Sequence, residues 1–194
     1  MIEREQQRTV EKEKTAIVER EYEKERVFVR AITSGKYSIR EERERQRAAP
    51  RIYKYKDSAW RGGPQHFHKT LLNPELGIMQ TLQSSVTEMA PGGFSQRHGH
   101  QNTALLYVLS GRGYDIHDGK RIDWEEGDMC LVAPGTVHQH FNLDKEKPAR
   151  FIIIKTKPIY NFANLNFQEF KEKSPERPVP GWENFKPDAD DHGH

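Results

Sequence analysis

The sequence predicts an all-β domain, an antiparallel sandwich or barrel, that follows a helical and highly charged N-terminal arm. The turn sequences SGRG, HDGK and EEGD recur at short intervals between residues 110 and 128, with short apolar runs between them. Within HDGK, the pair Asp118-Gly119 favours a tight hairpin, because these residue types tolerate the positive φ angles of a type I′ turn. Many short strands joined by such turns are typical of small sandwiches and barrels.

The N-terminal arm comprises residues 1–50, which contain 13 Lys or Arg and 11 Asp or Glu. Residues 4–32 lack Gly and Pro and are rich in Glu, Lys and Arg, a composition that favours an exposed helix. Their apolar residues are too sparse to hold that helix against a core. A break at residues 33–36 precedes a second short helix over 39–49, which Pro50 ends. We expect the arm to be mobile or to pack on another subunit.

The β domain is expected over residues 51–160, followed by a C-terminal helix and an extended tail over residues 161–194. The predicted strands fall at residues 51–60, 77–89 and 149–158, and in a series over 103–142. The strand at 149–158 contains an apolar run, which indicates burial on both faces. The tail is rich in Pro and acidic residues, which favours an extended conformation.

Composition excludes several classes of protein. A net charge of +2 gives no general case for nucleic-acid binding. No apolar run approaches the roughly 18–20 residues that a membrane helix needs, and the N-terminus has no apolar segment of a secretory signal. The single cysteine, Cys130, allows no intramolecular disulfide and fits a reducing compartment. We therefore expect a cytoplasmic protein with no membrane partner.

Two His-x-His pairs are the features that carry chemistry. Alternate side chains of a strand point to the same face, so His98 and His100 share a face, and Gln96 joins them by parity. By the same rule His138 and His140 share a face of a later strand, together with Asn142. Two such strands side by side in a small barrel would point several imidazoles at one place. Imidazole is a ligand for Fe, Zn, Cu and Ni, so the pattern indicates a metal site.

The order of these features resembles the cupin superfamily. The first cupin motif has Gly, five residues, His-x-His, three residues, Glu and a later Gly, and the second has Gly, a Pro-Gly turn, His and, four residues later, Asn. The matching residues here are Gly92, His98, His100, Gly111, Gly127, Gly135, His138 and Asn142. Ala104 stands where the motif has Glu. The resemblance implies a double-stranded β-helix, also called a jelly-roll barrel, with a metal held by His98, His100 and His138.

A narrower resemblance is to gentisate and related hydroxyaromatic dioxygenases. HGHQNTALLYVLSGRG at residues 98–113 and HQHFN at 138–142 are similar to their motifs. This implies one divalent metal, preferably Fe(II) with Mn, Ni or Zn possible, and dioxygen-dependent attack on a small aromatic or enolisable acid. His140 would be a catalytic group that hydrogen-bonds dioxygen or substrate.

Other interpretations stay open. The metal could instead support isomerisation, decarboxylation or lyase chemistry without dioxygen, or the barrel could bind a small molecule without catalysis. Ala104 could also mark a decayed metal site. The resemblance further implies a homodimer, because cupin barrels commonly pair through their outer sheets.

Weaker expectations concern the residues around the histidines. A substrate pocket is expected from the inward face of two strands, formed by Gln96, Ala104, Leu106 and Val108. Tyr107 would then point outward. Residues 60–69 are expected to form a loop, in which His66, His68 and Lys69 either face solvent or supply a cation to a carboxylate substrate. Cys130 is expected to be a buried small hydrophobe.

Overall fold

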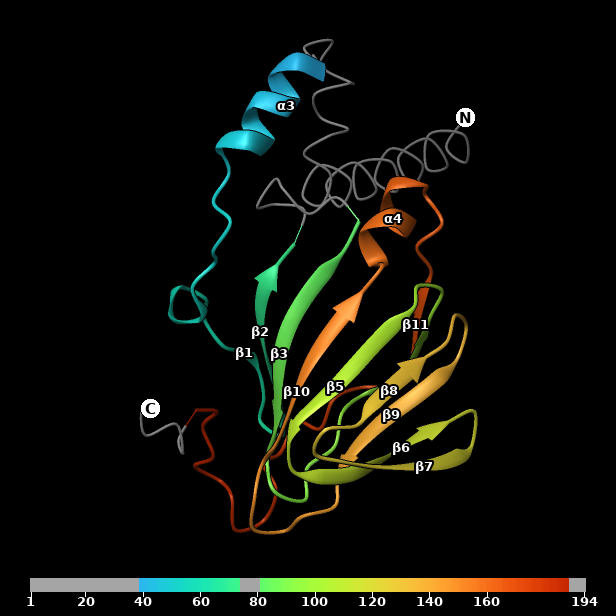
Figure 1. Cartoon of the computed structure of the whole chain (residues 1–194). Coiled ribbons are helices and arrows are strands. Elements are labelled where there is room, and N and C mark those ends of the chain that lie inside the picture. Colours follow the sequence, from blue (N-terminus) through green and yellow to red (C-terminus); the bar gives the residue numbers. More distant parts are fainter. Residues whose placement is uncertain (1–38, 74–80, 189–194) are drawn as a thin grey trace, which may run out of the picture.

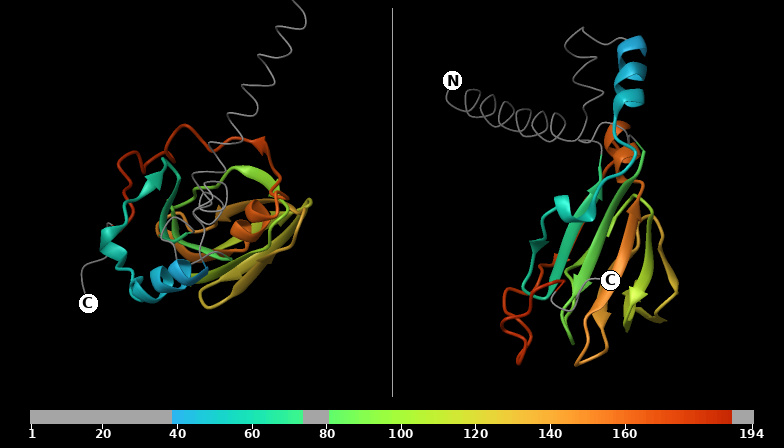
Figure 2. Two further views of the ribbon diagram at one scale, coloured as in Figure 1. Left: turned by 90° about the horizontal axis from the view of Figure 1, so that it is seen from above. Right: turned by 60° about the vertical axis from the view of Figure 1, so that its left-hand side comes forward.

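Two antiparallel β-sheets face each other and enclose a common interior in the computed structural model, which describes residues 39–73 and 81–188 (Figure 1; Figure 2). The order of strands is β1-β2-β3-β10-β5-β8 in the first sheet and β11-β4-β9-β6-β7 in the second. Strands close in sequence are thus divided between the two sheets, as in a jelly-roll barrel. This arrangement confirms the predicted all-β fold class.

The bounds of the elements are as follows. The helical segments are α3 (Ile39–Ala48), the 3₁₀ turn η1 (Tyr55–Asp57) and α4 (Lys157–Phe162). The strands of the first sheet are β1 (Arg61–Gly62), β2 (His66–Leu72), β3 (Gln83–Met89), β5 (Ala104–Ser110), β8 (Met129–Val132) and β10 (Ala149–Lys155). The strands of the second sheet are β4 (Arg97–His100), β6 (Arg112–His117), β7 (Lys120–Glu125), β9 (Val137–Asn142) and β11 (Gln168–Glu172).

Several predicted elements differ from the observed ones. The strand predicted at residues 51–60 is wrong, because this segment contains η1 and otherwise irregular backbone. The helix expected after residue 160 lies mainly before it, at α4, and β11 is a strand that the sequence did not indicate. The strand β10 has a buried face and a half-buried face. None of these differences changes the class of fold, since β11 only extends the edge of the second sheet.

The expected hairpin at Asp118-Gly119 is present and joins β6 to β7. Both turn residues have positive φ angles, 47° for Asp118 and 82° for Gly119, as a type I′ turn requires. Gly111, in the turn between β5 and β6, also has a positive φ angle of 90°. A Cβ atom there would lie 2.9 Å from Ala149, so the turn between the two sheets needs glycine.

Apolar side chains fill one part of the interior. The core contains Met89, Leu106, Val108, Trp124, Val132, Phe151 and Ile153. The rings of Trp124 and Phe151 meet edge to face, with centroids 4.8 Å apart, and join the two sheets. The remaining part of the interior is polar and contains four buried histidines, His98, His100, His138 and His140. The interior therefore has two parts, a packed apolar core and a buried polar site.

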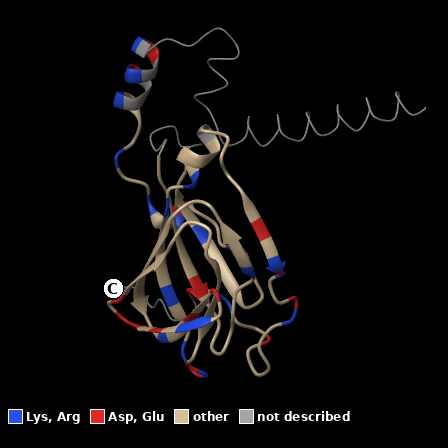
Figure 3. Ribbon diagram, turned by 90° about the vertical axis from the view of Figure 1, so that its right-hand side faces the viewer, with Lys and Arg blue, Asp and Glu red and all other residues tan. Residues whose placement is uncertain are grey.

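The charged arm lies largely outside the described residues, including the helix predicted over residues 4–32. Its second predicted helix is present as α3, whose side chains include exposed basic and acidic groups (Figure 3). Arg40 and Glu44 form an exposed ion pair one turn apart on this helix, with 3.2 Å between nitrogen and oxygen. In the described ranges, no helix has both the length and the apolar character that crossing a membrane requires.

Candidate metal centre

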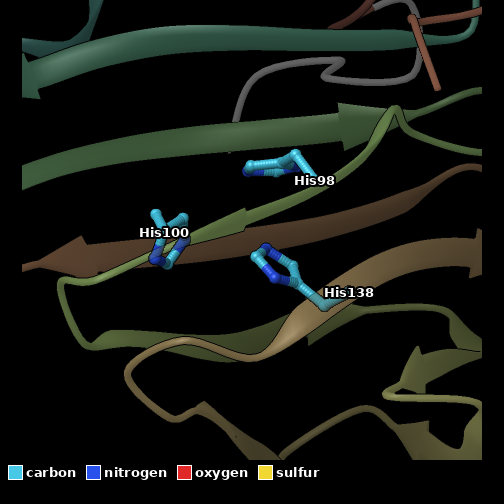
Figure 4. Close-up of side chains that lie close together, drawn as sticks. All are labelled: His98, His100 and His138. Atoms are coloured by element: carbon cyan, nitrogen blue, oxygen red, sulfur yellow. The ribbon is translucent and has the colours of Figure 1, made fainter. Parts of the chain in front are cut away.

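Three buried histidines meet in the polar part of the barrel (Figure 4). His98 and His100 come from β4, and His138 comes from the neighbouring strand β9, where it lies directly opposite His98. One ring nitrogen from each residue lies within 4.8 Å of the others. The strand period of two turns His98 and His100 to the same side, and the register of β4 with β9 adds the third imidazole.

Backbone carbonyls fix the orientation of two of these imidazoles. The Nδ1 atom of His100 lies 2.7 Å from the carbonyl oxygen of Asn102, and that of His138 lies 3.0 Å from the carbonyl of Thr136. A carbonyl only accepts, so each Nδ1 carries the proton and each Nε2 keeps its lone pair. Within the described residues, His100 Nε2 and His98 Nδ1 are buried and have no hydrogen-bond partner. A metal ion would satisfy both of these nitrogens.

The electrostatic environment keeps the three rings neutral. Burial lowers the pKa of His98 to about 3 and that of His100 to about 4, and the positive charge of Lys155 acts in the same direction. Burial, followed by repulsion from His140, lowers the pKa of His138 to about 2. Metal binding needs the neutral imidazole, so no proton has to be displaced from these rings near neutral pH. The residues present therefore fit a divalent transition metal.

Ala104 begins the strand β5 and is only 2% exposed. In the described part of the chain, the cluster around the three histidines contains no carboxylate. A dication held by these three neutral imidazoles would have no charge compensation from the cluster itself.

A buried carboxylate, Asp115 on β6, holds His140 in place behind this cluster. The Nδ1 atom of His140 lies 2.9 Å from Asp115 Oδ1, and the rings of His138 and His140 are 5.3 Å apart. Asp115 also accepts hydrogen bonds from Trp124 Nε1 at 2.9 Å and faces His117 Nε2 at 3.2 Å. Although burial raises the pKa of Asp115, attraction to His140 and these hydrogen bonds outweigh it and hold the pKa far below its usual range.

Cys130 is buried, as expected, but it also has a polar contact. Its Sγ atom lies 3.3 Å from Asp115 Oδ2 and donates a hydrogen bond to it. Burial and the negative charge of Asp115 raise the pKa of the thiol to about 12, so it stays protonated. Asp115, His117 and Cys130 form a second group of potential ligand atoms within 4.8 Å of one another.

The sequence analysis missed Asp115. One signal was available in the sequence. Asp115 shares a face of its strand with Gly113 and His117, and the neighbouring strand carries the second His-x-His pair. An acidic residue on the inward face of such a strand needs several donors, which the histidines supply.

The expected pocket residues are placed unequally. Leu106 and Val108 lie in the apolar core with Ala104, so they form the floor beside the histidines. Gln96 precedes β4 and is half-buried, and its Oε1 atom accepts a hydrogen bond from Ser174 in the C-terminal segment. Tyr107 points outward and is 40% exposed, as expected.

The loop expected at residues 60–69 is wrong in its second half, because His66, His68 and Lys69 belong to β2. Lys69 is buried and pairs with Asp188, at 3.4 Å, which removes it as a free cation for substrate. His66 lies on the face of β2 opposite to that of Lys69. Its Nε2 atom is buried with no hydrogen-bond partner among the described residues. Burial lowers the pKa of His66 to about 3, with further contributions from His140 and other charges. His66 is thus an additional polar group of the interior.

Comparison with known proteins agrees with this geometry. Residues 85–155 match the model of the family described as "Cupin domain". Over 93 residues the chain is 28% identical to gentisate 1,2 dioxygenase 1 of Aquipseudomonas alcaligenes, a match that covers 47% of this chain. A structure of salicylate 1,2-dioxygenase from Pseudoaminobacter salicylatoxidans superimposes with a TM-score of 0.51 at 19% identity over 56% of this chain. A structure of that enzyme with gentisate adducts gives a TM-score of 0.52 at 18% identity over 58% of this chain.

These relatives are longer than the matched region. The alignments cover 26% of the gentisate dioxygenase and 31% of each of the two salicylate dioxygenase chains. The superpositions on salicylate dioxygenase show a similar barrel fold. The match to gentisate dioxygenase is a similarity of sequence.

Proposed function

Because residues 85–155 form a cupin domain with three histidines in its interior, we propose that this protein is a metal-dependent dioxygenase. His98, His100 and His138 would hold one divalent metal, with Fe(II) preferred over Mn, Ni or Zn. The substrate would be a small aromatic or enolisable acid. The observation that carries the proposal is the convergence of three buried neutral imidazoles with no acidic ligand in the described part of the cluster.

The metal would supply positive charge and open coordination positions for an anionic substrate and dioxygen. The protein supplies the surroundings. Leu106 and Val108 offer an apolar floor on which a ring or alkyl chain can lie, and they limit access of water. The Asp115 carboxylate fixes the Nδ1 proton of His140, so that the opposite nitrogen of this ring can accept a hydrogen bond or a proton. His140 would therefore be the group that hydrogen-bonds substrate or dioxygen.

A second candidate is redox-neutral metal chemistry, such as isomerisation, decarboxylation or lyase action. The pair of Asp115 and His140 favours it, because a histidine oriented by a buried carboxylate is a common proton-transfer device. In this alternative, a metal held by the three histidines would supply Lewis-acid chemistry, and His140 would move the proton. The two candidates share the metal site and differ only in the need for dioxygen.

The deciding experiment measures dioxygen consumption. Protein loaded with Fe(II) under nitrogen is mixed with gentisate, salicylate, a β-diketone and a thiol in an oxygen electrode. Consumption of dioxygen together with loss of substrate supports the dioxygenase. Turnover that proceeds equally under nitrogen supports the redox-neutral candidate. Binding of these compounds without turnover in either gas would indicate a non-catalytic binding protein, and absence of metal uptake would indicate a decayed site.

We also propose that the protein forms a homodimer. Apolar side chains are exposed on the outer side of β5 and β8, namely Tyr107, Leu109, Met129 and Leu131. Met129 and Leu131, each more than half exposed, lie on β8, the edge strand of the first sheet. An apolar group of this kind at a sheet edge suits the same surface of a second copy. Residues 1–50 would add contacts to the partner.

A further inference from the structure

Lys155 ends the strand β10 and lies between two strands of the first sheet. It is paired in register with Ala104 of β5 and with Gln83 of β3. Alternate residues of β10 point inward, as the exposed fractions of Phe151 (2%) and Ile153 (7%) show. Lys155 has the same parity, and its side chain is half-buried. The lysine therefore belongs to the interior of the barrel, on the sheet that faces the three histidines.

The positive charge of Lys155 affects the pKa values of histidines on other strands. Burial is the main cause of the lowered pKa values of His98 and His100 on β4 and of His66 and His68 on β2, and the positive charge of Lys155 acts in the same direction. The geometry that places Lys155 on this side of the interior is its register, since it lies opposite Ala104 on the inward face of the first sheet. A bound dication would add further positive charge to this region. Excess charge of one sign in a buried site is unfavourable unless an anion compensates it.

In the described part of the chain, no carboxylate forms an ion pair with Lys155. The other buried or half-buried cations of this sheet are compensated, since Lys69 pairs with Asp188 and Arg150 pairs with Glu88 and Asp188. Burial and repulsion by Lys157 lower the pKa of Lys155 to about 8, which agrees with an ammonium that lacks an acidic neighbour. Among the described residues, Lys155 is therefore a cation without an acidic counter-ion.

Ala104 explains why the protein itself does not supply that counter-ion. Residues directly opposite each other in an antiparallel pair have Cβ atoms about 4.5–5.5 Å apart and share a face. Ala104 is the residue opposite Lys155, and it stands where the cupin motif has an acidic ligand. A glutamate there would lie beside the ammonium group, whereas the methyl group of alanine carries no charge. The pair of Ala104 and Lys155 leaves one negative charge missing next to the metal-binding histidines.

We propose that Lys155 binds the carboxylate group of the substrate and thereby selects anionic ligands for this site. The inference rests on the proposed function in that it places the substrate beside the three histidines. It also goes further, because it names the residue that recognises the acid group. Lys155 would act as a binding residue: the substrate carboxylate takes the place of the missing acidic side chain and neutralises the ammonium group.

The test compares binding of acids with binding of matched amides. Salicylate and salicylamide are titrated by calorimetry into protein loaded with Zn(II), which supports no dioxygen chemistry, and the Zn content of each sample is measured first. The variants are Lys155→Met, which removes the charge, and Lys155→Arg, which keeps it. Lys120→Met removes a positive charge from an exposed position on β7 and serves as the control.

We expect wild-type protein to prefer salicylate over salicylamide. Lys155→Met should weaken salicylate binding by about tenfold or more, as expected for the loss of a hydrogen bond to a charged group, and should leave salicylamide binding unchanged. Lys155→Arg and Lys120→Met should bind salicylate within about threefold of wild type, below the usual effect of a lost charged contact. Equal salicylate binding by wild type and Lys155→Met would overturn the proposal, as would wild-type protein without a preference for the acid.

The wild-type preference for the acid is measured without any variant, so it does not depend on whether a variant folds.

Failure of the proposed function would give a different result from failure of the Lys155 site. If no Zn(II) is taken up, the metal centre is refuted, and benzoate binding to the metal-free protein then tests Lys155 alone. Loss of benzoate binding in Lys155→Met would still support the carboxylate site, whereas no binding of benzoate to wild type would refute it as well.

Discussion

The Nδ1 atom of His140 and the Oδ1 atom of Asp115 are 2.9 Å apart in the buried interior, on two neighbouring strands of the same sheet. Asp115 is 1% exposed, and it also contacts Trp124, Cys130 and His117. One carboxylate therefore organises the side of the candidate site that lies behind His138.

Replacing Asp115 with Asn should reduce both stability and turnover. The amide can accept only through one oxygen and presents an N–H group to donors, so at least one buried group loses its partner, at a cost of about 2 kcal/mol. Urea denaturation measures the stability. The control is Asp123→Asn, whose carboxylate on β7 is exposed and pairs with Arg121. An Asp115→Asn protein as stable and active as this control would contradict the organising role of Asp115.

The same carboxylate predicts a dependence of stability on pH. Because the pKa of Asp115 is depressed in the folded state, its contribution is present above its unfolded pKa of about 4 and is lost as pH falls toward the folded value. The free energy of unfolding of wild type should therefore decrease below pH about 4. For Asp115→Asn, the free energy of unfolding measured by urea titration should decrease less steeply over the same pH range. Parallel curves for both proteins would show that other groups control the acid sensitivity.

Removal of any one of the three clustered histidines should abolish metal binding. His98→Ala, His100→Ala and His138→Ala each leave two imidazoles, too few for a site without acidic ligands. Elemental analysis of protein reconstituted with Fe(II) or Zn(II) gives the metal content, and circular dichroism checks the fold. His68→Ala is the matched control, because His68 is exposed on β2 and lies outside the cluster. Metal retained by all three variants would refute the assignment of ligands.

Chelation of the metal should lower the temperature of unfolding of the wild type. A ligand that binds only the folded state stabilises it according to its concentration relative to the dissociation constant. Calorimetry with and without EDTA measures the shift, and His138→Ala should show none. An unchanged melting temperature in wild type would mean that no metal is bound in the folded protein.

Ala104→Glu should keep metal binding and weaken binding of anionic substrates. The new carboxylate lies opposite Lys155 and near the metal-binding rings, so it competes with the substrate for both positive groups. Ala104→Gln has the same size without the charge and therefore controls for crowding at this buried position. Metal content and salicylate affinity are measured together for both variants. A rise in metal content and activity in Ala104→Glu would instead show that Ala104 marks a decayed ligand position.

Benzoate binding to the metal-free protein should weaken as pH rises through about 8, the pKa of Lys155. The lysine is charged below this pH and neutral above it, while benzoate stays ionised. The histidines near it do not titrate in this range, because their pKa values are lowered. Among the described residues, Lys157 is a nearby cation, and its charge contributes to the lowered pKa of Lys155 after burial. Lys155→Arg should abolish the pH dependence, and its persistence in that variant would assign it to another group.

Leu131→Lys should dissociate the proposed homodimer. The substitution places a charge on the exposed apolar edge strand β8, where the partner is expected. Light scattering coupled to size exclusion measures the mass. Leu165→Lys is the control, since Leu165 is also more than half exposed but lies in the C-terminal segment after α4. A dimer that survives Leu131→Lys but not truncation at Arg51 would assign the interface to the N-terminal arm.

The sequence by itself determined the class of fold and pointed to three histidines as candidate metal ligands. Turn residues such as Asp118-Gly119 act locally, because these residue types tolerate the positive φ angles of a type I′ turn, and the hairpin forms where it was predicted. The strand period predicted which histidines share a face, and the resemblance to cupins singled out His98, His100 and His138, which the structure brings together. Absence of an acidic residue at Ala104 was also visible in the sequence.

Only the tertiary structure decided which distant residues surround these histidines. Asp115, His66 and Lys155 come from three different strands, and pairing between strands far apart in sequence depends on the packing of the whole barrel. No local pattern distinguishes Lys69, which pairs with Asp188 on the outer face, from Lys155, which enters the interior. Each lysine points to the face that the register of its strand gives it, and the two lysines point to opposite faces. Register depends on pairing with strands that are distant in the sequence.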